Sequence, residues 1–208
     1  MEDKKLKRGQ EIKLTISDLA FGGRGISKRD DLVFFVKDAI PNQDVIAKIS
    51  KIKKKYVEAY NIKTLKDSTN QVDPVCEHFE WCGGCTTQQL DYQKQLHYKQ
   101  KQISDILNKI GGSKDLNINP IIGCEKTFFY RNKMEYTFSG VPWYIADESY
   151  DDIIIGLHVP KRFDKILNIN KCHINHEVFN EILKISKEVI VKEKMIPYDV
   201  RKHTGFLR

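Results

Sequence analysis

The chain has 208 residues, of which 40% are hydrophobic and 30% charged, with a formal net charge of +7. This composition is typical of a globular protein and excludes a disordered or fibrous chain. No apolar run approaches the roughly 18 residues needed to span a bilayer, and the lysine-rich start lacks the apolar segment of a secretory signal. We therefore expect a monomeric, cytoplasmic protein with no membrane partner, whose reduced cysteines are available as metal ligands.

The positive charge is concentrated in the N-terminal third of the chain. Residues 1–66 contain 16 lysines and arginines against 9 aspartates and glutamates, whereas residues 67–208 contain 19 of each kind. A basic module beside a neutral one is typical of a protein that binds a polyanion. The charge distribution therefore predicts a nucleic-acid partner, although a lysine-rich surface can also serve solubility alone.

Short strands separated by turns are expected over residues 9–65. Apolar and polar residues alternate there, which indicates half-buried strands. The expected strands are EIKLTISDLA (11–20), DLVFFV (31–36), QDVIAKIS (43–50) and KYVEAYNIKTL (55–65). Several short strands in so short a segment predict a small OB-like β-barrel.

Two features of this barrel are candidates for phosphate contact. The first is the hairpin tip KIKKK, which carries Lys51, Lys53, Lys54 and Lys55. Lysines at a hairpin tip suit phosphate binding, and the alternative is a sheet edge protected by charge. The second is Arg24 in the turn GGRGIS (22–27), where glycine permits a positive φ. This turn is not a phosphate-binding loop, because no Gly-Lys-Ser/Thr ending and no helix pattern follow it.

The remainder of the chain indicates a mixed α/β domain. The polar segment DSTNQVDPV (67–75) marks an expected boundary between domains at 1–66 and 67–208. A helix is expected after Cys85, since apolar residues recur at helical intervals until Gly111. Strand-like runs are expected between 120 and 172, followed by a helix at 176–193. The expected fold class is therefore α+β.

Three of the five cysteines lie together in CEHFEWCGGC (76–85). Thiols this closely spaced indicate a metal site rather than unrelated core residues. The fourth ligand must come from another cysteine or from a histidine, and the candidates are Cys124, Cys172, His78 and His173. The strand-like ILNIN before Cys172 favours that residue, whereas Cys124 lies in the apolar run IIGC, which is typical of a buried structural residue.

The spacing of the cysteines bears on the kind of metal. Cys172 follows Cys85 after 86 intervening residues. Structural zinc sites usually combine two short-spaced ligand pairs. A close trio with a distant fourth thiol is typical of plant-type ferredoxins instead. The spacing favours an iron–sulfur cluster and leaves zinc as the alternative.

The segment CEHFEWCGGCTTQQLDYQKQLHYKQKQI (76–103) resembles the cluster motif and following helix of the RNA uracil-C5 methyltransferases. These S-adenosylmethionine-dependent enzymes form 5-methyluridine in ribosomal or transfer RNA. The basic barrel resembles their TRAM domain, an OB-like RNA-binding module. YRNKMEYTF (130–138) and ILNINKCHI (166–174) are similar to segments of their central domain. The resemblance implies a 4Fe–4S cluster on Cys76, Cys82, Cys85 and Cys172.

The resemblance also implies that catalysis belongs to a C-terminal domain that holds S-adenosylmethionine. That domain is missing from these 208 residues, so no catalytic residue is assigned and we expect an RNA-recognition portion that is inactive alone. Within the family, 23S ribosomal RNA is favoured over transfer RNA. Arg131 and Lys133 are expected to add RNA contacts to those of the barrel. The alternative is a free-standing RNA-binding module with a structural zinc or iron–sulfur site, and an electron-transfer protein is disfavoured by the lysine-rich barrel.

Overall fold

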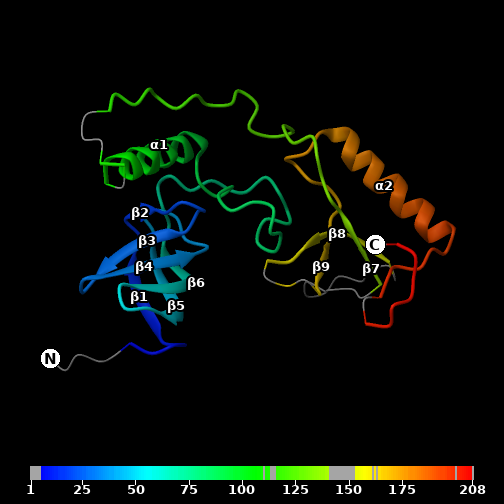
Figure 1. Cartoon of the computed structure of the whole chain (residues 1–208), viewed down its shortest axis with the longest axis horizontal. Helices are drawn as coiled ribbons and strands as arrows, with labels where there is room; N and C mark the ends of the chain where they lie inside the picture. The colour runs from blue at the N-terminus through cyan, green and yellow to red at the C-terminus, as the bar shows by residue number, and fades with distance from the viewer. Residues whose placement is uncertain are drawn as a thin grey trace. The chain divides into compact units, whose positions relative to one another are not determined.

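The computed structural model describes residues 6–109, 111–112, 116–140, 153–160, 162, 164–199 and 201–207 (Figure 1). The chain forms two compact units. Unit 1 comprises Met1–Asp73 and Thr86–Gly123, and unit 2 comprises Pro74–Cys85 and Cys124–Arg208. Each unit is therefore built from two separate stretches of sequence, and each is described by itself below.

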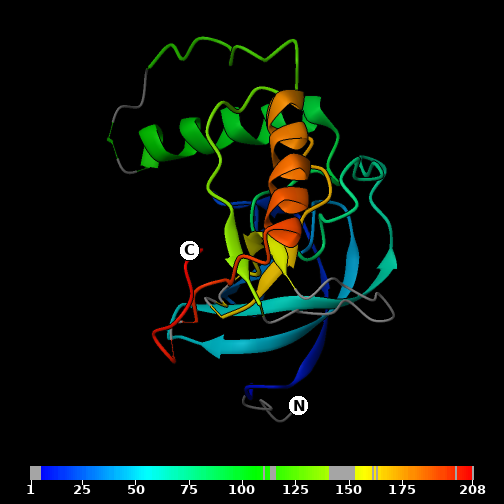
Figure 2. The ribbon, with the colours of Figure 1, turned by 90° about the vertical axis from the view of Figure 1, so that its right-hand side faces the viewer.

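Unit 1 is built around a six-stranded sheet with the order β1-β5-β6-β4-β3-β2. The strands are β1 (Glu11–Thr15), β2 (Asp18–Leu19), β3 (Gly25–Arg29), β4 (Leu32–Lys37), β5 (Asp44–Ile52) and β6 (Tyr56–Lys66). The pairing of β4 with β6 is parallel, and the other pairings are antiparallel. Figure 2 shows the two long strands β5 and β6 side by side in cyan and teal.

The two edge strands of this sheet are successive parts of one bent segment. β1 pairs with β5, and β2, which begins three residues after β1 ends, pairs with β3. Between them, the N–H of Ile16 donates to Gln43 O at 2.9 Å and the N–H of Ser17 donates to Ile26 O at 2.8 Å. The segment thus satisfies both edges of the sheet and closes it into a small barrel, which leaves no long unpaired edge. The strand-rich, OB-like N-terminal part expected from the sequence is confirmed.

The interior of the barrel is made of alternate residues along each strand. Val36, Val45, Ala47 and Val57 are fully buried, and Phe34 is 1% exposed. The intervening residues point to the outside, as the period of two along a strand requires. Gly25 is needed where β3 passes close to the chain, because a Cβ there would lie 2.7 Å from Ile16 Cγ2 and 2.9 Å from Ala39 O.

A helix, α1 (Tyr92–Lys109), belongs to unit 1 and matches the helix expected after Cys85. Leu90, just before it, is buried with Leu19 and Ile40, and Tyr98 packs against that group. Gln102 Nε2 donates to Leu19 O at 2.9 Å, and Lys101 forms ion pairs with Asp18 and with Asp105 on its own helix. The helix is therefore held by polar contacts as much as by apolar ones.

Unit 2 contains a three-stranded antiparallel sheet and a helix. The strands β7 (Thr137–Ser139), β8 (Ile154–His158) and β9 (Ile166–Asn168) are arranged in the order β7-β8-β9. The helix α2 (Glu177–Lys192) contacts β8 and begins at His176, whose side chain accepts from the N–H of Val178. The helix expected at 176–193 is thus confirmed, whereas the strand-like run around 130–138 is mostly irregular in the structure. No helix among the described residues is long and apolar enough to cross a membrane.

Candidate nucleic-acid interface and cysteine group

The lysine-rich tip expected between the third and fourth strands is the turn of the β5–β6 hairpin. The N–H of Lys53 donates to Tyr56 O at 2.9 Å and closes the hairpin. The four lysines are all exposed: Lys51, Lys53, Lys54 and Lys55. The hairpin therefore presents several positive charges on one ordered turn, where they are accessible to phosphates.

Arg24 and Lys51 meet at one carboxylate on the outside of the barrel. Arg24 Nη1 lies 3.6 Å from Glu58 Oε2, and Lys51 Nζ lies 4.0 Å from Glu58 Oε1. Gly22 and Gly23 take φ of 86° and 81°, values that favour glycine, and so form the turn that places Arg24 there. The structure thus brings the glycine-rich turn and the base of the lysine tip together, while their RNA-binding role stays a prediction.

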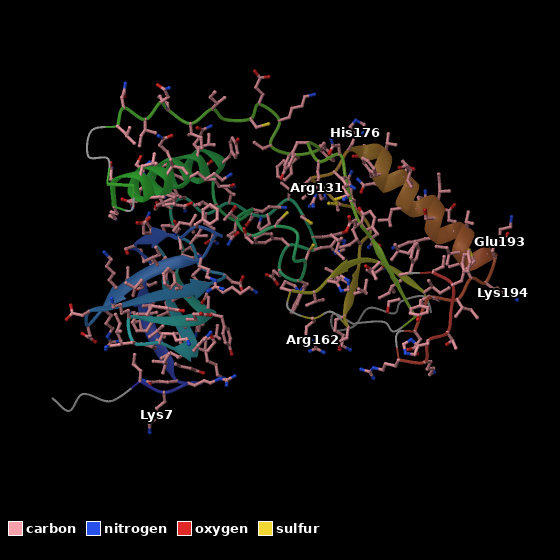
Figure 3. All side chains as sticks on the ribbon, viewed as in Figure 1. Lys7, Arg131, Arg162, His176, Glu193 and Lys194 are labelled. Carbon is pink, nitrogen blue, oxygen red and sulfur yellow. The ribbon has the colours of Figure 1, made fainter. Side chains whose placement is uncertain are left out.

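Arg131 and Lys133 lie in unit 2. The N–H of Arg131 donates to Ile174 O at 2.8 Å, and its carbonyl accepts from the N–H of His176 at 3.2 Å, which places it at the N-terminal end of α2 (Figure 3). Its charge is close enough to Cys82 to lower the pKa of that thiol slightly against the larger effect of burial. Lys133 forms an exposed ion pair with Glu135 at 2.8 Å. Neither residue shares a unit with the lysine tip.

Four cysteines of unit 2 are neighbours. Cys82 and Cys85 pack against the apolar group that contains Cys172. Burial raises the pKa of the Cys76 thiol, the N–H of His78 lowers it in part, and the nearby thiols of Cys82, Cys85 and Cys172 raise it further. Burial also raises the pKa of Cys82. These observations place the thiols in one region of unit 2, and their role as a shared ligand set stays a prediction.

The backbone around these thiols is suited to an approaching group. The N–H of Gly84 donates to Cys82 Sγ at 3.3 Å, and a Cβ on Gly84 would lie 3.4 Å from that sulfur. A thiolate donor set with backbone N–H groups directed at sulfur fits a metal or an iron–sulfur cluster in chemistry. However, no three His, Cys, Asp or Glu side chains in the described part of the chain lie close enough together to hold a metal ion. The described residues thus bring the thiols into one region but do not form a metal-binding group.

The other candidates for the fourth ligand are Cys124, His78 and His173, and they lie in different surroundings. Cys124 is exposed, which is the opposite of the buried position expected for it, and its Sγ lies 2.9 Å from Lys126 O. His78 is buried, and its Nε2 accepts the N–H of Asn170 at 3.2 Å, so this nitrogen already has a partner. The ring of His173 lies against Phe129, with ring centroids 6.3 Å apart.

Sequence reasoning missed a set of side chains on the outer face of the barrel. Lys37, Tyr60 and Lys48 lie on β4, β6 and β5 and are directly opposite one another in the strand register. The signal was present, because Tyr56, Glu58 and Tyr60 alternate with the buried Val57 and Ala59. Their partners on the neighbouring strands depend on register, which the alternation alone does not determine.

Comparisons with known proteins identify what the chain is similar to. Residues 5–60 match the TRAM domain family. A protein of Bacteroides thetaiotaomicron named an uncharacterized RNA methyltransferase is 38% identical over 91% of this chain and 43% of its own length. Proteins with the same description from Chlorobaculum tepidum and Porphyromonas gingivalis are 31% and 32% identical over 97% and 94% of this chain, and 44% of their own length in both cases. The chain thus spans less than half the length of these relatives.

A solved structure shares the fold. The crystal structure of the tRNA (uracil-54, C5)-methyltransferase of Pyrococcus abyssi, in complex with S-adenosyl-L-homocysteine, matches 93% of this chain with a TM-score of 0.60. The match covers 40% of that protein at 24% sequence identity. At this level of identity the likeness concerns the fold.

The expectation of an inactive fragment without a catalytic domain is contradicted. Proteins named RNA methyltransferases align with 91% to 97% of the chain, and the methyltransferase structure matches 93% of it. The expectation was based on the resemblance, which assigns catalysis to a C-terminal domain that these 208 residues were taken to lack. The comparisons show instead that the chain is similar to RNA methyltransferases along nearly its whole length, and that residues 5–60 match the TRAM domain.

Proposed function

We propose that this protein is an S-adenosylmethionine-dependent RNA methyltransferase that modifies uracil at C5, and that its N-terminal barrel binds the RNA. The observation that carries the proposal is that the TRAM match covers strands β1 to β5 and the first half of β6 in the basic barrel. The relatives named RNA methyltransferases support the activity. The structurally similar tRNA (uracil-54, C5)-methyltransferase, solved with S-adenosyl-L-homocysteine, supports the methyl donor and the target base.

The lysine tip of the β5–β6 hairpin would supply affinity for the RNA backbone. Each lysine that neutralises a phosphate releases a counterion. For a single strand, the logarithm of the affinity therefore falls by about 0.7 per contact for each tenfold rise in salt concentration. Lys53, Lys54 and Lys55 are exposed at the turn and free of the Glu58 pairing that involves Lys51. They would bind without regard to sequence, since phosphates carry no base information.

The activity is tested with purified protein, S-adenosylmethionine carrying an isotopically labelled methyl group, and transcripts of 23S ribosomal RNA and of transfer RNA. The two transcripts are compared directly, since the family resemblance favours 23S ribosomal RNA over transfer RNA. We expect 5-methyluridine in one of them by mass spectrometry of the digested RNA. Absence of methyl transfer to both transcripts would contradict the proposed activity.

The role of the lysine tip is tested by replacing Lys53, Lys54 and Lys55 together with alanine. RNA affinity should fall, and the salt dependence of log Kd should become shallower by about two units if all three contact phosphates. The matched control removes three exposed lysines of unit 2 instead: Lys184, Lys192 and Lys202. Equal losses in both triple variants would show a general charge effect and contradict a binding role for the tip.

We also propose that Cys76, Cys82, Cys85 and Cys172 hold a 4Fe–4S cluster, with zinc as the alternative metal. The neighbourhood of the four thiols and the Gly84 N–H directed at Cys82 support the proposal. When bound, such a cluster would tie the 76–85 loop to the segment after β9, which is a structural rather than a redox contribution.

The ligand set is tested by Cys172→Ser, with Cys124→Ser as the matched control. Protein purified without oxygen is analysed for iron, sulfide and zinc, and its visible absorbance is recorded. We expect Cys172→Ser to lose the iron and the brown colour, and Cys124→Ser to keep both. Full iron content in Cys172→Ser would remove this residue from the ligand set, and colourless wild-type protein with stoichiometric zinc would favour zinc.

A further inference from the structure

Tyr60 lies on the outer face of the barrel between two lysines. It is directly opposite Lys37 of β4 on one side and Lys48 of β5 on the other. Residues opposite each other in neighbouring strands present their side chains on the same face. With neighbouring strands about 4.8 Å apart, the backbones at the two lysines lie roughly 10 Å from each other across the sheet, on either side of the tyrosine. Tyr60 is 39% exposed, so its ring is accessible from this face.

Two further aromatic rings lie on the same face. Phe35 is opposite Glu58, and Tyr56 is opposite Val33. These pairs lie two and four residues from the Lys37–Tyr60 pair along the same strands, so their side chains point to the same face. The rings of Phe35 and Tyr56 meet edge to face, with centroids 5.7 Å apart and an interplanar angle of 76°. Both residues are half-buried, whereas the alternate positions Val57 and Ala59 are buried inside the barrel. The three rings therefore lie outside the barrel core.

Cations lie on both sides of the aromatic residues on this face, and one of them, Lys37, pairs with the exposed Asp38 at 3.1 Å. Lys28 of β3 is in register with Val33, and therefore continues the row that contains Tyr56. Arg24 and Lys51 converge on Glu58 at 3.6 and 4.0 Å, next to the row of Tyr60. These partly exposed pairs are weak, so Arg24 and Lys51 can exchange the carboxylate for a phosphate. The face thus combines aromatic rings with cations at fixed spacing.

We propose that this face is a stacking platform for single-stranded RNA, in which Tyr60 stacks on a base and Lys37 and Lys48 contact the flanking phosphates. This inference rests on the proposed RNA-binding function and names the form of RNA that the barrel takes. An exposed ring between cations recognises an unpaired base, because bases in a duplex are already stacked on one another. Lysines alone would bind paired and unpaired RNA alike.

The test measures binding of a labelled 12-nucleotide RNA by fluorescence anisotropy, once as a single strand and once annealed to its complement. Tyr60→Leu keeps an apolar side chain and removes the aromatic ring. We expect it to weaken single-strand binding by about five- to a hundredfold, and Tyr60→Phe to stay within about twofold of wild type. Binding of the duplex should be unchanged by either variant. Phe206→Leu is the matched control, because Phe206 is 79% exposed in unit 2.

The two lysines are tested separately by Lys37→Gln and Lys48→Gln. Each should make the salt dependence of log Kd for the single strand shallower by about 0.7. Wild-type affinity in Tyr60→Leu, or an equal loss for duplex and single strand, would overturn the platform. If the Lys53, Lys54 and Lys55 variant still weakens binding in that case, the proposed RNA-binding function stands without it. Failure of wild-type protein to bind either RNA would overturn both.

Discussion

The two sheets of this protein are stabilised by different kinds of core. The barrel of unit 1 encloses eleven buried residues that are all aliphatic, aromatic or alanine. The core of unit 2 includes Cys172, is joined by the partly buried Cys82 and Cys85, and lies beside the buried polar residues Asn175 and Asn180. The main core of the barrel is therefore apolar, with the buried Gln43 accepting from the N–H of Ile40 outside it, while the core of unit 2 includes a cysteine and lies against buried amide side chains.

The two sheets also differ in the lengths of their strands. β5 and β6 have 9 and 11 residues, whereas β7 and β9 have three each. Long strands in a closed sheet satisfy their own backbone groups, but short ones leave backbone groups for side chains to pair. The Asn180 side chain does this for both backbone groups of Cys172. The comparison indicates that single polar residues matter more in unit 2.

The two tryptophans of the sequence allow the units to be followed separately. Trp81 and Trp143 both belong to the sequence of unit 2. Tryptophan fluorescence in a urea titration therefore reports on unit 2, and hydrogen exchange of peptides from residues 11–66 reports on the barrel. The four predictions that follow use these two signals, from the largest expected effect to the smallest.

Phe34→Ala should destabilise the barrel most. Phe34 is 1% exposed inside the barrel, and removing a buried phenyl ring costs about 3–5 kcal/mol through lost burial and the cavity that remains. Hydrogen exchange of barrel peptides should accelerate accordingly. Phe21→Ala is the control within the same unit, because Phe21 is 80% exposed. A loss below about 1 kcal/mol in Phe34→Ala would contradict a tightly packed apolar core.

Gly156→Ala should disrupt the sheet of unit 2. A Cβ at this position in β8 would collide with the backbone carbonyl of Leu167, and backbone cannot move aside cheaply. We expect a loss of about 3 kcal/mol in the fluorescence-detected unfolding of unit 2. Gly140→Ala is the control, since its Cβ would meet Pro197 at an ordinary 3.8 Å. Equal stability of the two variants would contradict the close β8–β9 pairing.

Asn180→Ala tests whether hydrogen bonds from a buried amide side chain stabilise unit 2. The N–H of Cys172 donates to Asn180 Oδ1 at 2.9 Å, and Asn180 Nδ2 donates to Cys172 O at 3.2 Å. Its removal leaves two buried backbone groups unpaired, which costs about 2 kcal/mol. The exposed Lys184→Ala on the same helix should be neutral. A neutral Asn180→Ala would show that water replaces the amide and that the contrast between the two cores is smaller than the contacts indicate.

Lys101→Met should have the smallest effect, about 0.5 kcal/mol, because its ion pairs are partly exposed. Hydrogen bonds to Asp18 and Asp105 raise the pKa of Lys101 above its ordinary value of 10.5. The contribution is therefore present at neutral pH and is lost as the pH rises through the raised pKa. Lys99→Met on the same helix is the control. A difference between the two variants that persists at pH 12 would contradict an electrostatic origin.

The sequence predicted the elements whose signal is local. Alternation in EIKLT and DVIAKIS identified strands of the barrel, and helical periodicity identified α1 and α2. Strand β3 was not predicted, because the glycines before it indicated a turn. Of the strand-like run at 130–138, only residues 137 and 138 are in a strand, as part of β7. Tyr136 and Phe138 pack against the core of unit 2, whereas Tyr130 is exposed, so the apolar residues of this run do not all serve one ladder.

The candidate site was predicted in part for the same reason. Lysines 51–55 and the cysteine trio are recognisable because they are contiguous in sequence. The convergence of Arg24 and Lys51 on Glu58 was not recognisable, because these residues come from three different segments. The exposure of Cys124 was also misjudged, since an apolar run predicts burial only when another element covers it.

By itself the sequence determined the basic N-terminal barrel, the two helices and the close cysteine trio, because each depends on residue types at short spacing. Only the tertiary structure decided which distant residues meet. It packed Cys82 and Cys85 against the apolar group that contains Cys172, and it placed Tyr60 between Lys37 and Lys48. Such neighbours depend on strand register and chain crossing, and a shift of one residue would turn every side chain of β6 to the other face.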